Sequence, residues 1–249
     1  MKWIGLEFYK LRRKRIIPMI LLFLAVELAW AFISVTMSLS RNPDSAGWEI
    51  VLVTVSSMNG LFLPIIAAVV ASRVCDMEHK GDTWKMLLAA SVKRGHIYGA
   101  KYGCACLLML LAIVVQTAGI ASFGLVNGFE QVLPAMLLLR FVAGTLLTSM
   151  VVLALQQWLA LAVKNQAFGL CLGMIGGFIG MTADMFPLFV RRIFIWTYYT
   201  GLSPVAYSYE QETMHIIGRQ IDGQLLIIVI AAGLVCYAAG MLHVSRQDV

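Results

Sequence analysis

Residues 16–39 read IIPMILLFLAVELAWAFISVTMSL, an apolar run with one ionisable side chain, Glu27, near its middle. An apolar run of about 20 residues is long enough to cross the hydrocarbon core of a membrane as a helix. Similar runs recur along the 249-residue chain, in which 60% of the residues are hydrophobic and 13% are charged. The sequence therefore predicts an all-α, polytopic membrane protein.

We expect six transmembrane helices, because polar or turn-forming residues separate six apolar runs. These runs take up most of the chain, so we expect 1–249 to form a single transmembrane domain without a large aqueous catalytic domain. The predicted spans are Ile16–Leu39, Ile50–Ser72, Tyr102–Val126, Phe141–Val163, Gln166–Ala183 and Leu225–His243.

The segment before the first span, 1–15, is too polar to cross a membrane. Ile4, Phe8 and Leu11 recur at helical spacing, opposite the basic side chains of Lys10 and its neighbours. This pattern predicts an amphipathic helix that lies in the membrane interface. A disordered basic tail is the alternative interpretation.

The positive charges predict the orientation of the chain, because Lys and Arg are enriched in cytoplasmic loops. With the N-terminus inside, fourteen of the 19 Lys and Arg residues fall on the cytoplasmic side and five outside. Both termini and the loop 73–101 are then cytoplasmic, facing the anionic lipid of the inner leaflet. The five external residues are Arg41, Arg140, Arg191, Arg192 and Arg219.

The external segment 185–223 is rich in aromatic residues but too short and too charged to form a comfortable span. We expect helices that lie on or dip into the external leaflet, where aromatic rings are enriched. Trp196, Tyr198 and Tyr199 are candidates to line an external vestibule that contacts substrate. An aromatic belt at the membrane surface is the alternative.

Glu27 is the ionisable residue that stands out within a predicted span. A central acidic group is costly in a membrane and usually faces protein or water. It is either a neutral carboxyl that hydrogen-bonds within the bundle or part of a translocation path. Amide side chains available as partners are Asn59, Gln116, Gln156 and Gln157.

Gly169, Gly173 and Gly177 recur every four residues in the fifth predicted span. Small residues at this spacing let two helix backbones approach closely in lipid. The sequence favours neither of two partners for this face, a helix of the same chain or a second subunit.

Several functional classes lack their motifs in this sequence. There is no G-x-x-x-x-G-K-[ST] motif for nucleotide phosphates and no H-E-x-x-H. The four histidines are scattered, and none of the five cysteines forms a C-x-x-C pair. We therefore expect a non-catalytic subunit with no metal site, no cofactor of its own and no nucleic-acid partner.

Residues 78–101, EHKGDTWKMLLAASVKRGHIYGAK, interrupt the apolar sequence with a cluster of charges. Asp82 is suited to cap a short helix over 83–90. Trp84, Leu87 and Leu88 fall at i, i+3 and i+4, giving this helix one apolar stripe. The stripe suits the groove of a partner protein. A helix that rests on the inner leaflet is the alternative.

The pattern E-x-x-G-x-T…L-L…S-V-K-R…G-A-K resembles the first intracellular loop of ABC-2 type permeases, the membrane subunits of small bacterial ABC transporters. The N-terminal L-E-F-Y-K-L-R-R resembles the interfacial elbow helix of that family. Ser91 stands where many members have proline, which affects the turn after the short helix. The matched positions are Glu78, Gly81, Thr83, Leu87, Leu88, Val92, Arg94 and Lys101.

The resemblance implies that this loop holds a coupling helix, which docks on a separately encoded ATPase. It also implies two ATPase subunits, which hold the ATP and Mg, and a second permease protomer, identical or homologous. The residues expected to couple to the ATPase are Glu78, Gly81, Asp82, Thr83, Trp84, Lys85, Leu87 and Leu88.

The chain length and the lack of a fused ATPase are similar to those of the lantibiotic-immunity and bacitracin-resistance permeases of Gram-positive bacteria. This similarity implies a cell-membrane permease that exports or expels antimicrobial peptides or similar amphiphiles. Other members of the family move drugs, sodium or polysaccharide. A membrane sensor or accessory protein that binds such peptides without transport is the alternative from another class.

Overall fold

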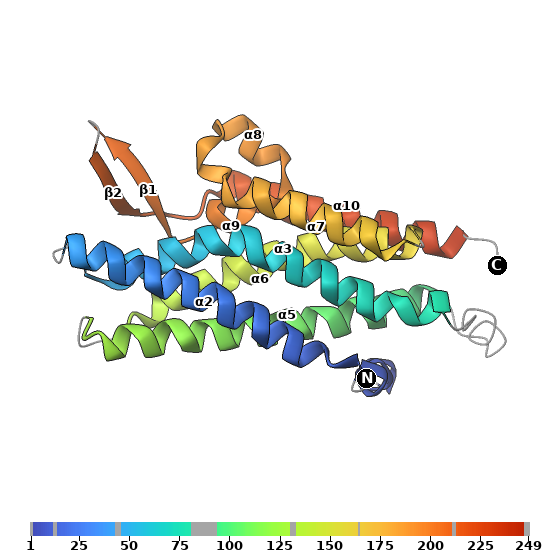
Figure 1. The fold of residues 1–249 in the computed structure, drawn as a ribbon. Coiled ribbons are helices and arrows are strands. Elements are labelled where there is room, and N and C mark those ends of the chain that lie inside the picture. The colour runs from blue at the N-terminus through green and yellow to red at the C-terminus, as the bar shows by residue number, and fades with distance from the viewer. Residues whose placement is uncertain are drawn as a thin grey trace.

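The computed structural model shows long helices running side by side along one axis, with both termini at the same end (Figure 1). We call this the terminal end. The opposite end is called the hairpin end, after the two short strands Val205–Glu210 and Thr213–Gly218 that lie there. The structure describes residues 2–11, 14–42, 46–80, 94–129, 133–163, 165–210 and 213–246. The longer helices are α1 (Lys2–Leu11), α2 (Ile16–Arg41), α3 (Trp48–Lys80), α5 (Arg94–Val126), α6 (Ala135–Ala162), α7 (Gln166–Met181) and α10 (Gly223–Arg246).

Five of these helices, α2, α3, α5, α6 and α10, are long and apolar enough to cross a membrane. The expectation of a helical, multi-pass membrane protein is therefore confirmed. Helix α7 is apolar but has only 16 residues. At about 1.5 Å per residue it rises roughly 24 Å, less than the roughly 30 Å of a hydrocarbon core. A sixth span stays a prediction.

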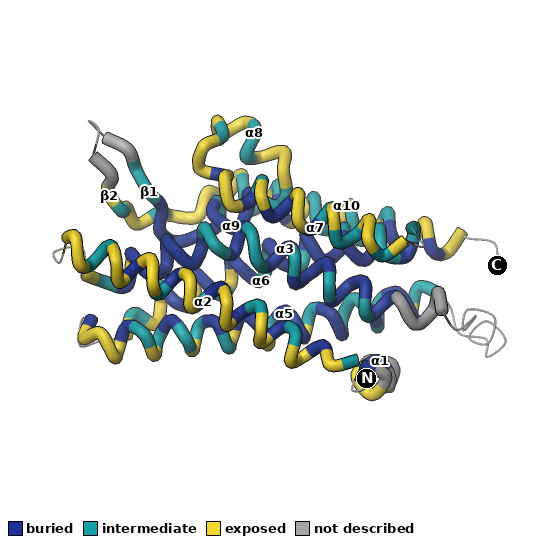
Figure 2. The backbone as a smooth tube through the Cα atoms, in the orientation of Figure 1, coloured by how far each residue is buried: buried dark blue, intermediate teal, exposed yellow. Residues whose placement is uncertain are grey.

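Helix α3 lies at the centre of the bundle and packs against α2, α5, α6 and α7. Of its most apolar stretch 67% is buried, against 28% for α2 and 17% for α10 (Figure 2). A central helix must be apolar on every side, so its sequence carries little sign of which face meets which neighbour.

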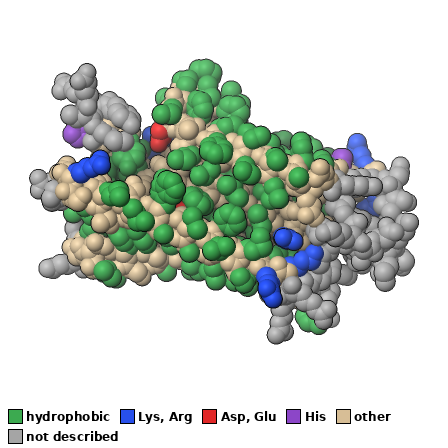
Figure 3. All heavy atoms as spheres, in the orientation of Figure 1, with side chains coloured by type: hydrophobic (Ala, Val, Ile, Leu, Met, Phe, Trp, Pro, Cys, Tyr) green, Lys and Arg blue, Asp and Glu red, His purple; other side chains and the backbone are tan. Residues whose placement is uncertain are grey.

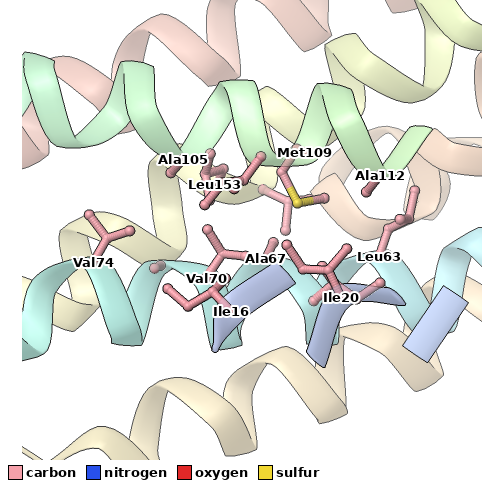
Figure 4. Packing of buried hydrophobic residues seen from close by; sticks show 14 of the residues in the cluster. Ile16, Ile20, Leu63, Ala67, Val70, Val74, Ala105, Met109, Ala112 and Leu153 are labelled. Carbon is pink, nitrogen blue, oxygen red and sulfur yellow. The ribbon is translucent and has the colours of Figure 1, made fainter. Parts of the chain in front are cut away.

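The two largest apolar clusters of the described residues lie one after the other along the bundle, and two smaller clusters pack α10 against its neighbours. The first lies toward the terminal end, where Ile20, Val70, Met109 and Leu153 meet from α2, α3, α5 and α6 (Figure 4). The second lies toward the hairpin end and includes Ala31, Val55, Ile120 and Phe141 of the same helices. Between them lies a polar layer, described below.

Hydrophobic side chains cover the middle of the visible face, and Lys and Arg side chains lie near its ends (Figure 3). Helix α1 packs against α5 at the terminal end, and its Leu11 joins the first cluster. Polar ends on either side of an apolar band are what a protein in a bilayer requires.

The segment between α7 and α10 was expected to contain helices alone, and the structure differs from this expectation. A β-hairpin follows its short helices, pairing Val205 with Gly218 and Tyr207 with Ile216. Val205 is buried in the second cluster. Strands of six residues are too short to stand out in such a sequence. The elements are η3 (Ala183–Met185), α8 (Leu188–Ile193), η4 (Ile195–Thr197), α9 (Tyr198–Gly201), β1 (Val205–Glu210) and β2 (Thr213–Gly218).

Helices α3 and α5 both extend into the predicted loop 73–101, because α3 continues to Lys80 and α5 begins at Arg94. The helix expected over 83–90 lies outside the described residues. The same holds for the expected coupling residues Gly81, Asp82, Thr83, Trp84, Lys85, Leu87 and Leu88, and for the side chain of Glu78.

Candidate functional site

A layer of polar side chains separates the two apolar clusters in the middle of the bundle. Glu27 of α2, Asn59 of α3, Gln116 of α5 and Ser149 of α6 form this layer, and none is more than 1% exposed. On each helix the polar residue lies between a residue of the first cluster and one of the second. These flanking pairs are Leu24 and Ala31, Leu63 and Val55, Ala112 and Ile120, and Val152 and Phe141.

Two hydrogen bonds join side chains of the layer. Gln116 donates through Nε2 to Oδ1 of Asn59 at 2.7 Å, which links α5 to α3. The hydroxyls of Ser149 and Tyr199 lie 3.1 Å apart, which links α6 to α9. Because buried polar groups are costly without partners, these bonds hold the helices in register.

Glu27 is buried between these two pairs. Gln116 and Tyr199 are both close enough to interact electrostatically with its carboxyl group. Neither carboxyl oxygen makes a geometrically sound hydrogen bond to the described residues, and the same is true of Oε1 of Gln116 and Nδ2 of Asn59. The layer thus contains one unused amide donor and three unused oxygens.

A neutral carboxylic acid complements this set of groups. Such a group can donate as well as accept, as a layer with both unused oxygens and an unused amide donor requires, whereas an ionised carboxylate only accepts. A charge without a partner would also be costly at this depth. We infer that Glu27 is neutral in this arrangement. This geometry fits both expectations for Glu27, a structural carboxyl and a group on a translocation path.

Glu27→Gln and Glu27→Leu should separate hydrogen bonding from charge. The glutamine can still donate and accept, so we expect a melting temperature close to that of the original protein. The leucine removes the carboxyl group, so the unused amide atoms of the layer face an apolar side chain, at about 1–3 kcal/mol for each buried polar group. The measurement is the thermal melt in detergent, with Ser34→Leu on the exposed face of α2 as control. Equal melting temperatures for all three variants would show that Glu27 is incidental.

The other two candidate amides lie away from the layer. Gln157 donates through Nε2 to the carbonyl oxygen of Tyr98 at 3.0 Å, which links α6 to α5. With its amide in the orientation that satisfies both atoms, Gln156 donates to the carbonyl of Gly169 and accepts from the amide of Gly173. Both glutamines therefore stabilise packing between helices and do not reach Glu27.

The glycine face of α7 lies against α3 of the same chain. A Cβ atom at Gly173 would meet Cβ of Ala68 at 2.6 Å, and one at Gly177 would meet the carbonyl oxygen of Leu61 at 2.7 Å. Gly169 has more room, with its nearest neighbour atom at 3.9 Å. Contact between two helices this close requires residues without side chains. A subunit interface that uses the same residues stays a prediction.

A buried ion pair attaches α1 to the bundle. Lys101 of α5 is 0% exposed and donates through Nζ to Oε2 of Glu7 at 3.1 Å. It also donates to the carbonyl oxygen of Val74 on α3 at 2.9 Å. Three helices thus meet at one ammonium group. Sequence reasoning assigned Lys101 only to a motif, because nothing local links it to a residue so far away in the chain.

The three aromatic residues considered for a vestibule point inward. The ring of Trp196 lies over Gly176 of α7. Tyr198 is buried and donates its hydroxyl hydrogen to the carbonyl oxygen of Arg192 at 2.9 Å. Tyr199 reaches the polar layer through Ser149. Contact with a substrate stays a prediction for all three.

The described residues include no group of three His, Cys, Asp or Glu side chains arranged to hold a metal ion. The polar layer offers amides, hydroxyls and one carboxyl. Such a set can form hydrogen bonds with a polar ligand, exchange a proton or hold helices in register.

Residues 3–180 match a family model described as ABC-2 family transporter protein. The chain belongs to the ABC-2 family. ABC-2 proteins are membrane components of ABC transporters and associate with an ABC ATPase, so this chain is a permease subunit. No individual curated protein matches the chain closely enough to count as a relative.

The ABC-2 match includes the polar layer residues of α2 to α6, the pair of Glu7 and Lys101, and nearly all of α7. It ends before the short helices, the hairpin and α10. The polar layer of α2 to α6 and the ion pair of Glu7 and Lys101 therefore lie within the region that matches the family model, whereas α10, which also packs against α6, lies outside it.

Proposed function

We propose that this permease subunit exports or expels membrane-active peptides or similar amphiphiles, powered by a separate ATPase. The observation that carries the proposal is the ABC-2 match over residues 3–180. The proposed transporter contains two permease protomers, identical or homologous, and two ATPase subunits that bind ATP and Mg. In this proposal α7 is a sixth, short span, and the protein lies in the cell membrane of a Gram-positive bacterium.

An apolar hollow on the outer face of α2 supports an amphiphilic substrate. The hollow is shallow and open, because residues of α2 alone line it, Trp30 and Ser34 among them. Its lining is almost wholly apolar and faces sideways, where the bilayer would lie. A molecule with an apolar part can reach such a surface from within the membrane, whereas a small ion gains nothing from it.

The arrangement of the termini supports an inward-facing terminal end. Both termini, the end of α3 and the start of α5 lie at that end (Figure 1). With that end in the cytoplasm, fourteen of the 19 Lys and Arg residues face inward. The loop between α3 and α5 is then accessible to a cytoplasmic ATPase, as the proposed coupling through Glu78 to Leu88 requires.

Trp84→Ala tests this coupling. If Trp84 anchors the ATPase, its loss should cost on the order of 2 kcal/mol or more, roughly thirtyfold in affinity. The measurements are pull-down of an ABC ATPase by this chain and resistance of cells to a lantibiotic, at matched membrane expression. Leu87→Ala should behave in the same way, and Ser245→Ala at the end of α10 is the control.

Each outcome of this experiment has a separate meaning. Loss of both pull-down and resistance supports the proposed function and its coupling site. Retained pull-down with lost resistance shows that the loop transmits motion without anchoring the ATPase. If the original protein retains no ATPase, it is a sensor or accessory protein, and if it retains an ATPase but does not protect cells, it transports another substrate. Either result shows that the proposal is wrong.

A further inference from the structure

A cavity at the hairpin end opens between the short helices that follow α7 and the start of α10. Its volume is about 270 Å³. The cavity combines cationic and apolar side chains, and it lies beyond the part of the chain that matches the family model. The lining residues used below are Leu188, Arg191, Arg192, Arg219, Asp222 and Leu225.

The cavity holds three guanidinium groups, and carboxylates pair with two of them. Arg191 lies 2.8 Å from Asp184, and Arg192 lies 3.3 Å from Asp222. Arg219 has no carboxylate partner in the described part of the chain. Its guanidinium reaches only the carbonyl oxygen of Thr200, at 3.5 Å. Among the described residues, the cavity therefore has one more guanidinium group than paired carboxylates.

The surroundings of Arg219 are unfavourable for an unpaired cation. Burial lowers the pKa of its guanidinium, and repulsion by the nearby Arg191 lowers it further, with Asp184 opposing both. Arginine stays charged in proteins, so the cost of burying its charge is offset when the guanidinium pairs with an anion and not when it loses a proton. An anion placed between Arg191 and Arg219 would offset the cost of burying the Arg219 charge and would reduce the repulsion between the two guanidinium groups.

The position of the cavity indicates which anion is available. Asp222 accepts a hydrogen bond from the backbone amide of Gln224 at 2.9 Å and so caps the start of α10. Helix α10 is apolar from Leu225 onward, and the apolar side chains of α8 are exposed. The cavity thus lies where a membrane-facing surface meets polar residues. That is the depth of lipid headgroups.

We propose that this cavity binds the phosphate group of an anionic phospholipid. Arg219 and Arg191 bind the phosphate oxygens, since the planar guanidinium group suits charge-assisted, bidentate bonds to phosphate. Leu188 and Leu225 contact the first carbons of the lipid chains. The lipid then holds the short helices against the start of α10. This site does not depend on the proposed transport function.

The test is the retention of lipid by the purified protein. The protein is washed in detergent with equal amounts of phosphatidylglycerol and phosphatidylcholine, and bound lipid is measured by native mass spectrometry. We expect selective retention of phosphatidylglycerol, which Arg219→Gln should weaken by about tenfold. Arg41→Gln removes an exposed arginine at the same end of the bundle and should leave retention unchanged. A thermal melt shows whether Arg219→Gln is folded, and Arg219→Lys should restore part of the binding.

A second arm identifies the source of the phosphate. Inorganic phosphate is added at increasing concentration to the protein with bound phosphatidylglycerol. Displacement at millimolar concentration would show that the cavity recognises phosphate alone, and resistance to displacement would show that the lipid chains contribute. Equal retention of both lipids, or equal retention by Arg219→Gln and the original protein, would overturn the proposal.

Discussion

Lys101→Met is expected to detach α1 from the bundle and to lower the free energy of unfolding by about 3–5 kcal/mol. The variant keeps a long side chain but removes the ammonium group that binds Glu7 and the carbonyl oxygen of Val74. A carboxylate buried at this junction then loses the charge it pairs with. The measurement is unfolding of the purified protein in detergent, together with membrane yield.

The double variant Glu7→Leu with Lys101→Met is the matched control. Replacement of both members of a buried ion pair by apolar residues is often neutral or stabilising, whereas removal of one is costly. We therefore expect the double variant to regain much of the stability that Lys101→Met loses. With Glu7→Leu alone, the four proteins form a cycle that measures the coupling energy. If Lys101→Met is as stable as the original protein, the ion pair does not hold α1 against the bundle.

Gly177→Leu is expected to separate α7 from α3 and to cost more than about 3 kcal/mol, above the usual range for overpacking. The added side chain would begin 2.7 Å from the carbonyl oxygen of Leu61, a backbone atom that cannot rotate away. Gly173→Leu should behave similarly because of the contact with Ala68. The measurements are the yield of folded protein and its elution in size-exclusion chromatography.

Gly169→Leu provides the control within the same helix. Its nearest neighbour is the side-chain oxygen of Gln156, which can move, so we expect a folded protein. If Gly169→Leu folds but elutes as a smaller species than the original protein, this end of α7 contributes to a subunit interface. If Gly177→Leu is as stable as Gly169→Leu, the contact between α7 and α3 is not as close as the structure indicates.

The candidate site could be predicted only in part. The sequence pointed to Glu27 because an acidic residue in an apolar run is rare and costly. It also provided a list of amides, but it could not show that Asn59 and Gln116 lie at the same level while Gln156 and Gln157 do not. Ser149 and Tyr199 were not considered as a pair, because a hydroxyl in an apolar helix is common and carries no local signal.

The sequence by itself determined that this is a multi-pass helical membrane protein. Length and hydrophobicity belong to each segment separately, and a run such as 16–39 satisfies its backbone hydrogen bonds as a helix wherever its neighbours lie. The ABC-2 loop motif and the interfacial pattern of α1 are likewise local features. These could be read one segment at a time.

Only the tertiary structure decided which helices meet and at which faces. Lipid is as apolar as leucine, so hydrophobicity does not distinguish a lipid-facing side of α3 from a protein-facing one. Close packing and a few buried polar contacts make that distinction instead. Lys101 binds Glu7, and Gln116 donates a hydrogen bond to Asn59. The backbone of Leu61 leaves room only for glycine at position 177. Such contacts join residues far apart in the chain, and shape and hydrogen bonding become complementary only when the helices are assembled.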